Sequence, residues 1–140
     1  MAAEDESRIA IESDADVVTA RQRARELAAD LELSSTDQTL LATAISEVAR
    51  NITTYATRGE VLVEVVTDDD RRGIRVVASD QGPGIEDIER ALQDGYTTGG
   101  GLGLGLPGAR RLVDDFSIDS APGRGTTVTL VKWSRSSGRS

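Results

Sequence analysis

Two strand-like runs that lie close together in the middle of the chain constrain the fold most. Residues 60–67 (EVLVEVVT) and 73–79 (GIRVVAS) are rich in β-branched residues, and only the charged turn 68–72 (DDDRR) separates them. Runs joined by such a short turn pair as an antiparallel hairpin. The sequence therefore predicts antiparallel sheet at its centre, and a doubly wound parallel sheet fits less well.

The segments on either side of this hairpin add helices and further strands. Residues 8–12 (RIAIE) alternate apolar and polar side chains as a half-buried strand does. Apolar residues then recur at helical spacing, with Ser13 and Asp14 as caps of a first helix and Ser35 with Gln38 as a capping box of a second. The further expected elements are helices over about 14–31, 35–55, 86–93 and 107–115 and strands over 116–120 and 126–133.

This order predicts an α+β fold, a two-layer α/β sandwich. Strands joined in hairpins form a mixed, mostly antiparallel sheet, and helices cover one of its faces. The length of 140 residues suits one domain, with a core over about 8–133 and flexible segments over 1–7 and 134–140.

Composition excludes several kinds of site. The chain has no Cys and no His, so thiol and imidazole metal ligands, Cys or His nucleophiles and Ser-His pairs are absent. The net charge of -8 argues against a nucleic acid or an anionic membrane as partner and favours proteins or small ligands. Neither an apolar run of about 18 residues nor a signal segment is found, so we expect a cytoplasmic protein.

Residues 99–108 (GGGLGLGLPG) hold six of the 14 glycines of the chain. They match the G-x-G-x-x-G pattern of dinucleotide sites, but the preceding loop 94–98 (DGYTT) is polar where that pattern requires an apolar strand. A P-loop would need a Lys, and the only one is Lys132. Glycines let backbone N–H groups approach an anion, and Pro107 can open a helix whose N-terminus favours phosphate. We interpret the segment as a phosphate-covering lid; a plain surface loop is the alternative.

Glu47 and Asn51 form a second candidate cluster on the second helix. They are four residues apart, so both side chains point from one face. A carboxylate and a carboxamide oxygen one turn apart can hold Mg²⁺, which prefers oxygen ligands, and can orient a water or a hydroxyl. The alternative is a solvated polar stripe opposite the core.

The turn 80–84 (DQGPG) follows the second strand of the hairpin and is the third candidate. Gly82 and Gly84 can take backbone conformations closed to other residues, and Asp80 offers acceptors for a donor such as an exocyclic amine. An ordinary Asp-containing turn is the alternative.

The order of these motifs resembles a known family. E-x-x-x-N on a helix precedes D-x-G-x-G after a strand, a glycine segment that opens a helix, and GRGT (123–126) before the last strand. This order resembles the GHKL (Bergerat-fold) ATP-binding family of gyrase, histidine kinases and MutL, over about residues 8–133. The short length and the segment 94–116 (DGYTTGGGLGLGLPGARRLVDDF) are most similar to the bacterial anti-sigma and switch serine/threonine kinases, in particular the switch kinase of the stressosome.

The resemblance implies ATP/ADP and Mg²⁺ as cofactors. Asn51 would ligate the Mg²⁺ that bridges the ATP phosphates, and Glu47 would act as base or orienting carboxylate for the substrate hydroxyl. Phosphoryl transfer depends mostly on positioning and charge neutralisation, which one Mg²⁺ and a small domain can supply.

The resemblance also implies the contacts to the nucleotide. Asp80 would accept a hydrogen bond from the adenine amino group, Gly82 and Gly84 would form the turn beneath adenine, and Thr126 would add a polar contact. The phosphates would be wrapped by Gly101, Leu102, Gly103, Leu104 and Gly105.

The function that the resemblance implies is a serine/threonine protein kinase in a bacterial stress or sigma-factor pathway. Such a kinase phosphorylates a Ser or Thr of a STAS-domain antagonist and, when released, activates a PP2C-type phosphatase. One alternative is an anti-sigma factor that sequesters a sigma factor and phosphorylates its antagonist, because both classes share every catalytic residue. The other is a non-catalytic nucleotide-binding scaffold.

Overall fold

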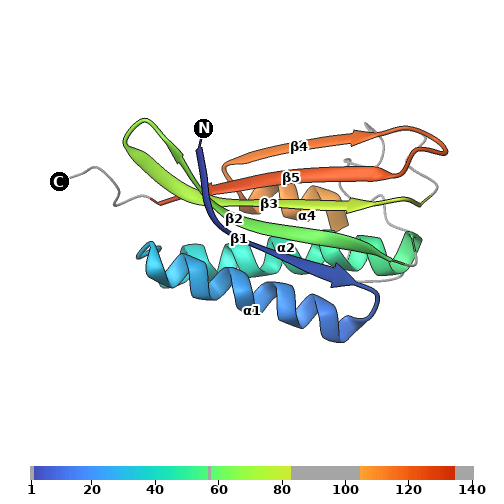
Figure 1. The fold of residues 1–140 in the computed structure, drawn as a ribbon, viewed down its shortest axis with the longest axis horizontal. Helices are drawn as coiled ribbons and strands as arrows, with labels where there is room; N and C mark the ends of the chain where they lie inside the picture. The colour runs from blue at the N-terminus through green and yellow to red at the C-terminus, as the bar shows by residue number, and fades with distance from the viewer. Residues whose placement is uncertain (1, 57, 83–104, 135–140) are drawn as a thin grey trace.

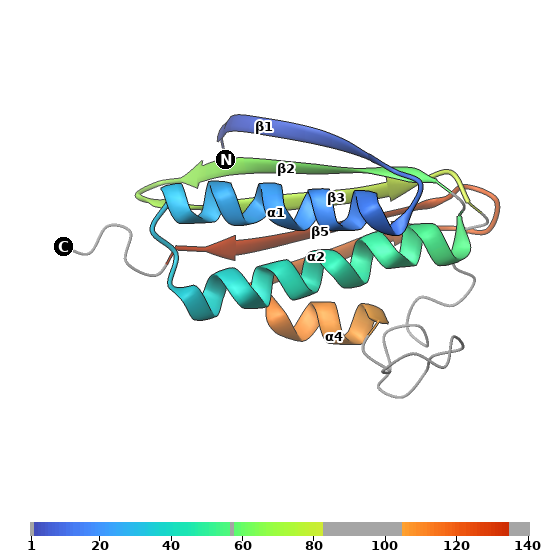
Figure 2. The same ribbon diagram turned by 90° about the horizontal axis from the view of Figure 1, so that it is seen from below.

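The computed structural model describes residues 2–56, 58–82 and 105–134. One five-stranded sheet in the order β1-β2-β3-β5-β4 carries the described helices on a single face (Figures 1 and 2). The elements are β1 (Ala2–Ile11), α1 (Asp14–Asp30), α2 (Ser35–Tyr55), β2 (Gly59–Asp68), β3 (Arg71–Asp80), α4 (Gly105–Leu112), β4 (Asp115–Ser120) and β5 (Thr126–Trp133). The predicted two-layer α+β fold is confirmed.

All four neighbouring strand pairs of this sheet are antiparallel, where a mixed and mostly antiparallel sheet was expected. The charged turn joins β2 to β3 as predicted, and the two strands pair over ten residues each. The last strand, β5, lies between β3 and β4, so the centre of the sheet combines segments that are far apart in the sequence (Figure 1).

The core lies between the sheet and the helices. Alternate residues of β2, β3 and β5 point to the helical side, among them the fully buried Val61, Val63, Val76 and Leu130. On that side α2 lies between α1 and α4 (Figure 2), and its apolar stripe is buried: Leu41, Ala44, Ile45, Val48, Ala49 and Ile52. None of the helices in the described residues is long and apolar enough to cross a membrane.

Polar caps fix where the first two helices begin. At the start of α1 the Asp16 carboxylate accepts hydrogen bonds from the backbone N–H groups of Ser13 and Glu12, at 3.1 and 2.9 Å. The cap of α2 is Ser34, whose hydroxyl accepts from the Asp37 N–H at 3.0 Å, one residue before the Ser35 that we expected. Ser34 and Ser35 are adjacent and either serine can cap a helix, so the sequence alone did not decide which of them is the cap.

Most other boundaries differ from the predictions by one or two residues. The larger differences are at the first strand and the last helix, and one predicted helix lies outside the described residues. The first strand begins at Ala2 and not at residue 8, because it continues to pair with β2 beyond an irregularity between Glu4 and Glu6. The helix expected over 107–115 runs from Gly105 to Leu112. The short helix expected over 86–93 lies outside the described residues.

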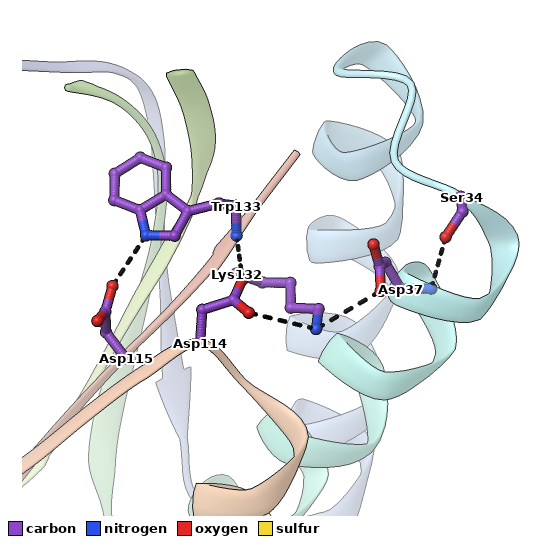
Figure 3. A network of polar contacts seen from close by, with 6 residues as sticks. All are labelled: Ser34, Asp37, Asp114, Asp115, Lys132 and Trp133. Carbon is purple, nitrogen blue, oxygen red and sulfur yellow. Dashed lines mark hydrogen bonds and ion pairs between the residues drawn. The ribbon is translucent and has the colours of Figure 1, made fainter. Parts of the chain in front are cut away.

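An ionic network around the buried Lys132 joins α2, β5 and the start of β4 (Figure 3). The ammonium group of Lys132 lies 3.5 Å from a carboxylate oxygen of Asp37 and 3.9 Å from one of Asp114. The other Asp114 oxygen accepts from the backbone N–H of Trp133 at 2.7 Å, and the Trp133 indole N–H donates to Asp115 at 2.8 Å. These contacts attach the segment that follows α4 to the N-terminal end of α2, so α4 runs antiparallel to α2 (Figure 2).

Candidate functional site

One row of residues crosses the sheet at the end opposite the Lys132 network. Asp80 at the end of β3 pairs with Gly59 of β2 on one side and with Thr126 of β5 on the other. Thr126 in turn pairs with Ser120 of β4. Directly opposed residues point to the same face of a sheet, so the Asp80, Thr126 and Ser120 side chains stand side by side.

Asp80 is a buried acidic residue at the end of β3. Asp80 as a residue is only 8% exposed to solvent. One oxygen, Oδ1, accepts from the Gly82 N–H at 2.8 Å, and in the described part of the chain no donor reaches the other oxygen. Because burial of an unpaired acceptor is costly, this oxygen is a candidate acceptor for a donor from a ligand.

The hydroxyl of Thr126 lies next to it. Thr126 is 6% exposed, and its Oγ1 lies 2.9 Å from the Ser120 Oγ. The Ser120 hydroxyl donates to the Gly125 carbonyl at 2.8 Å. Thr126 is a site residue predicted from the sequence, and the structure brings it beside Asp80. Ser120 was not predicted, because its place beside Thr126 depends on the pairing of β4 with β5.

Two glycines allow the backbone to approach at this end of the sheet. Gly82 does not have a positive φ; a Cβ there would lie 2.6 Å from the Ala56 Cβ, so the residue is needed because the end of α2 packs against the turn. We had expected Gly82 to be needed for a backbone conformation closed to other residues, and the structure shows that close packing against Ala56 is the reason instead. Gly125 has φ +77°, and a Cβ there would collide with the Asp80 carbonyl oxygen. Both glycines therefore allow the neighbouring backbone to lie close to Asp80.

Glu47 and Asn51 lie on the flank of α2 that faces away from α1. The neighbouring Ser46 is on the α1 side, where its hydroxyl accepts from Arg21 at 3.4 Å, and each following residue is rotated by about 100°. The Glu47 side chain is 15% exposed, with one carboxylate oxygen 3.7 Å from an Arg50 guanidinium nitrogen. Asn51 is half-buried, and its amide has no hydrogen bond within the described residues. The expected cluster on one helix face is thus present.

The remaining predicted site residues belong mostly to segments outside the described part: Gly84, Gly101, Leu102, Gly103 and Leu104. Gly105 is the first residue of α4. Because α4 runs antiparallel to α2, its N-terminus points toward the end of the molecule where α2 and β3 finish (Figure 2). In the described residues no three Asp, Glu, His or Cys side chains cluster as a metal site.

The match to a family model agrees with this arrangement. Residues 11–132 match the model of the histidine kinase-like ATPase domain. The chain belongs to the histidine kinase-like ATPase family. The GHKL resemblance of its motifs is therefore confirmed over nearly the whole described sheet and its helices.

Relatives in this family narrow the class further. The chain is 47% identical over 131 residues to the serine/threonine-protein kinase RsbT of Bacillus subtilis, which covers 94% of this chain and 98% of that protein. It is also 32% identical over 111 residues to the anti-sigma F factor of the same species, with 74% of this chain and 75% of that protein covered. The protein is an ATP-dependent serine/threonine kinase of this family, as its motifs predict.

A solved structure supports the fold of the kinase. The RsbU and RsbW domains of Rv1364c from Mycobacterium tuberculosis superpose with a TM-score of 0.64 at 25% sequence identity. The match covers 94% of this chain and 33% of that one, so this chain spans about a third of its length. The predicted α+β sandwich is thereby found in a relative of known structure.

Proposed function

We propose that the end of the sheet at Asp80 binds the adenine base of ATP. The observation that carries this proposal is the buried Asp80 oxygen that lacks a donor in the described residues, beside the buried hydroxyl of Thr126. The adenine amino group supplies the missing donor, and Thr126 adds a second polar contact. Gly82 and Gly84 form the turn against the base. Gly82 has no side chain, which also permits the close packing of the end of α2 against this turn.

The phosphates extend from this base toward the N-terminus of α4. A helix N-terminus carries unpaired N–H groups and a positive dipole end, both of which favour phosphate. The glycine segment that leads into α4 covers the phosphates through Gly101 to Gly105. In this placement the three predicted parts of the nucleotide site converge at one end of the molecule.

Asn51 fits a magnesium ion that arrives with the nucleotide. Mg²⁺ takes one or two protein oxygens and completes its shell with phosphate and water, so the small donor set on α2 is sufficient. The Asn51 amide oxygen is the ligand, because no group in the described residues hydrogen-bonds to it. Bound there, Mg²⁺ supplies neutralisation of phosphate charge.

Glu47 is the catalytic carboxylate. It lies one helical turn before Asn51 on the same flank and is mostly buried, so it is held beside the phosphates and away from bulk solvent. It orients the Ser or Thr hydroxyl of the protein substrate and accepts its proton as the phosphoryl group transfers.

The protein substrate is a STAS-domain antagonist, and the released kinase activates a PP2C-type phosphatase. This switch-kinase function is favoured over an anti-sigma function because identity to RsbT is 47% over almost the whole of both chains, against 32% over three quarters for the anti-sigma F factor. Phosphorylation adds a charge of about -1.5 to -2 to the antagonist, and the kinase itself carries -8. Repulsion between like charges would then release the product.

The test is transfer of labelled γ-phosphate from ATP to purified STAS-domain proteins, with the Glu47→Ala variant as control. We expect one STAS protein to be labelled by the wild type and not by the variant, and the variant to retain ATP binding. A pull-down then separates the partner classes: capture of a sigma factor would favour the anti-sigma alternative. ATP binding without transfer to any partner would favour the scaffold.

A further inference from the structure

We propose that Ser120 is a positioning residue that makes the base site selective for a 6-amino purine against a 6-oxo purine. It does so by fixing the direction in which the Thr126 hydroxyl points its proton. This inference rests on the proposed adenine site and adds to it a residue of the neighbouring strand β4, which touches no nucleotide.

The hydrogen bonds of Ser120 determine the donor in its contact with Thr126. A serine hydroxyl has a single proton and two lone pairs. That proton goes to the Gly125 carbonyl at 2.8 Å, because a carbonyl oxygen can only accept. In the 2.9 Å contact between the two hydroxyls, the proton therefore comes from Thr126, and Ser120 accepts it.

The consequence is that Thr126 offers a ligand only its lone pairs. Asp80 as a carboxylate also offers only acceptors. The two residues face each other in the strand register, which separates their Cβ atoms by about 4.5 to 5.5 Å. A ligand group placed between them meets acceptors from both sides and must itself donate.

This requirement separates two kinds of purine. The amino group at position 6 of adenine has two N–H donors, whereas the carbonyl at the same position of hypoxanthine or guanine has none. A 6-oxo purine would place its oxygen against the Asp80 carboxylate and the lone pairs of Thr126. Both residues are less than 10% exposed, at 8% and 6%, so water can relieve this mismatch only poorly. Sites built to bind an N–H group reject analogues that lack it by large factors.

Removal of the Ser120 hydroxyl frees the Thr126 proton. In Ser120→Ala the Thr126 hydroxyl can rotate and donate to the oxygen of a 6-oxo purine. The probe is inosine triphosphate (ITP), which differs from ATP in having the carbonyl at position 6 and a proton on N1. Calorimetric titration of the purified protein in Mg²⁺ gives the dissociation constants for ATP and ITP, and their ratio measures the selectivity.

We expect the ratio of the dissociation constants for ITP and ATP to fall about tenfold from the wild type to Ser120→Ala. This is the typical effect of one hydrogen bond gained or lost by a buried polar group. Ser117→Ala is the matched control, since Ser117 lies on the same strand with its side chain exposed on the opposite face. Ser120→Thr keeps a hydroxyl and should keep the ratio. In the double variant Ser120→Ala/Thr126→Val the gain in ITP binding should disappear.

Parallel weakening of ATP and ITP in Ser120→Ala, with an unchanged ratio, would overturn the proposal, because it would show that Ser120 only supports the Gly125 turn. If Ser120→Ala does not fold, Ser120→Cys carries the test, since a thiol fills similar space but is a weak hydrogen-bond partner. Failure of the adenine site itself has a different signature: the wild type would then bind ATP no better than ITP, or Asp80→Asn would bind ATP normally.

Discussion

Replacement of Asp80 by Asn should separate nucleotide binding from stability. The substitution keeps the size of the side chain and replaces one acceptor oxygen by an NH₂ donor. If the amide oxygen keeps the bond from the Gly82 N–H, the NH₂ group points to the place where the adenine amino group would donate. A charge-assisted hydrogen bond is lost there, worth about 1.5 to 3 kcal/mol. This predicts a dissociation constant for ATP about 10- to 150-fold higher.

The stability of the nucleotide-free protein should respond differently. Asp80 as a residue is 8% exposed, and its carboxylate has one hydrogen bond within the described residues, so its burial is poorly compensated. The neutral amide is cheaper to bury, which offsets the weaker bond to Gly82. We therefore expect the free energy of unfolding to change by less than about 1 kcal/mol, which is the typical size of a point-mutation effect.

Urea denaturation and calorimetric titration with Mg-ATP test both halves of this prediction. Asp119→Asn is the control, because Asp119 is exposed on β4 and should change neither quantity. ATP binding by Asp80→Asn at the wild-type level would refute the adenine assignment. A loss of stability of several kcal/mol would refute the reasoning about burial, since it would mean that Asp80 holds the turn together.

Three further predictions concern catalysis, the turn and the buried network. Glu47→Gln should keep ATP affinity but lower the initial rate of phosphate transfer at least about 100-fold, as loss of an acid-base group does. Gly125→Ala should destabilise the protein by more than about 2 kcal/mol in denaturant titration, because Gly125 has a positive φ and an added Cβ would collide with the Asp80 carbonyl oxygen. Gly123→Ala is the control: Gly123 also has a positive φ, +78°, but open space around it, so this change should cost only about 1 kcal/mol. Lys132→Met should cost about 3 kcal/mol in the same assay, because it removes the cation that lies beside the buried Asp37 carboxylate. An unchanged denaturation midpoint would contradict the network.

Strong local patterns account for what the sequence predicted well. The strand 126–133 was predicted with the bounds that the structure has, because its residues 127–130 (TVTL) alternate polar and apolar side chains and a glycine turn precedes it. The hairpin of residues 60–67 and 73–79 was predicted from two β-branched runs and a charged turn, and in the structure its strands extend to 59–68 and 71–80. By contrast, the start of β1 has the polar composition AAEDES, which carries no alternation, and its pairing depends on β2.

Non-local contacts account for what the sequence could not predict. Ser120 acquires its role only because β4 pairs with β5 in one register, and a shift of one residue would turn it to the other face. Lys132, the only lysine, is buried at the end of β5, although lysine is almost never fully buried unless paired. Its partners Asp37 and Asp114 come from segments 77 residues apart in the chain, so no local pattern could identify the network.

The most direct test of the nucleotide site is a crystal structure of the protein with Mg²⁺ and a non-hydrolysable ATP analogue. We predict that the amino group of adenine lies 2.7 to 3.2 Å from an Asp80 carboxylate oxygen, an ordinary N–H···O distance, beside Thr126. The phosphates should lie at the N-terminus of α4. A base bound away from the row of Asp80, Thr126 and Ser120 would contradict the account.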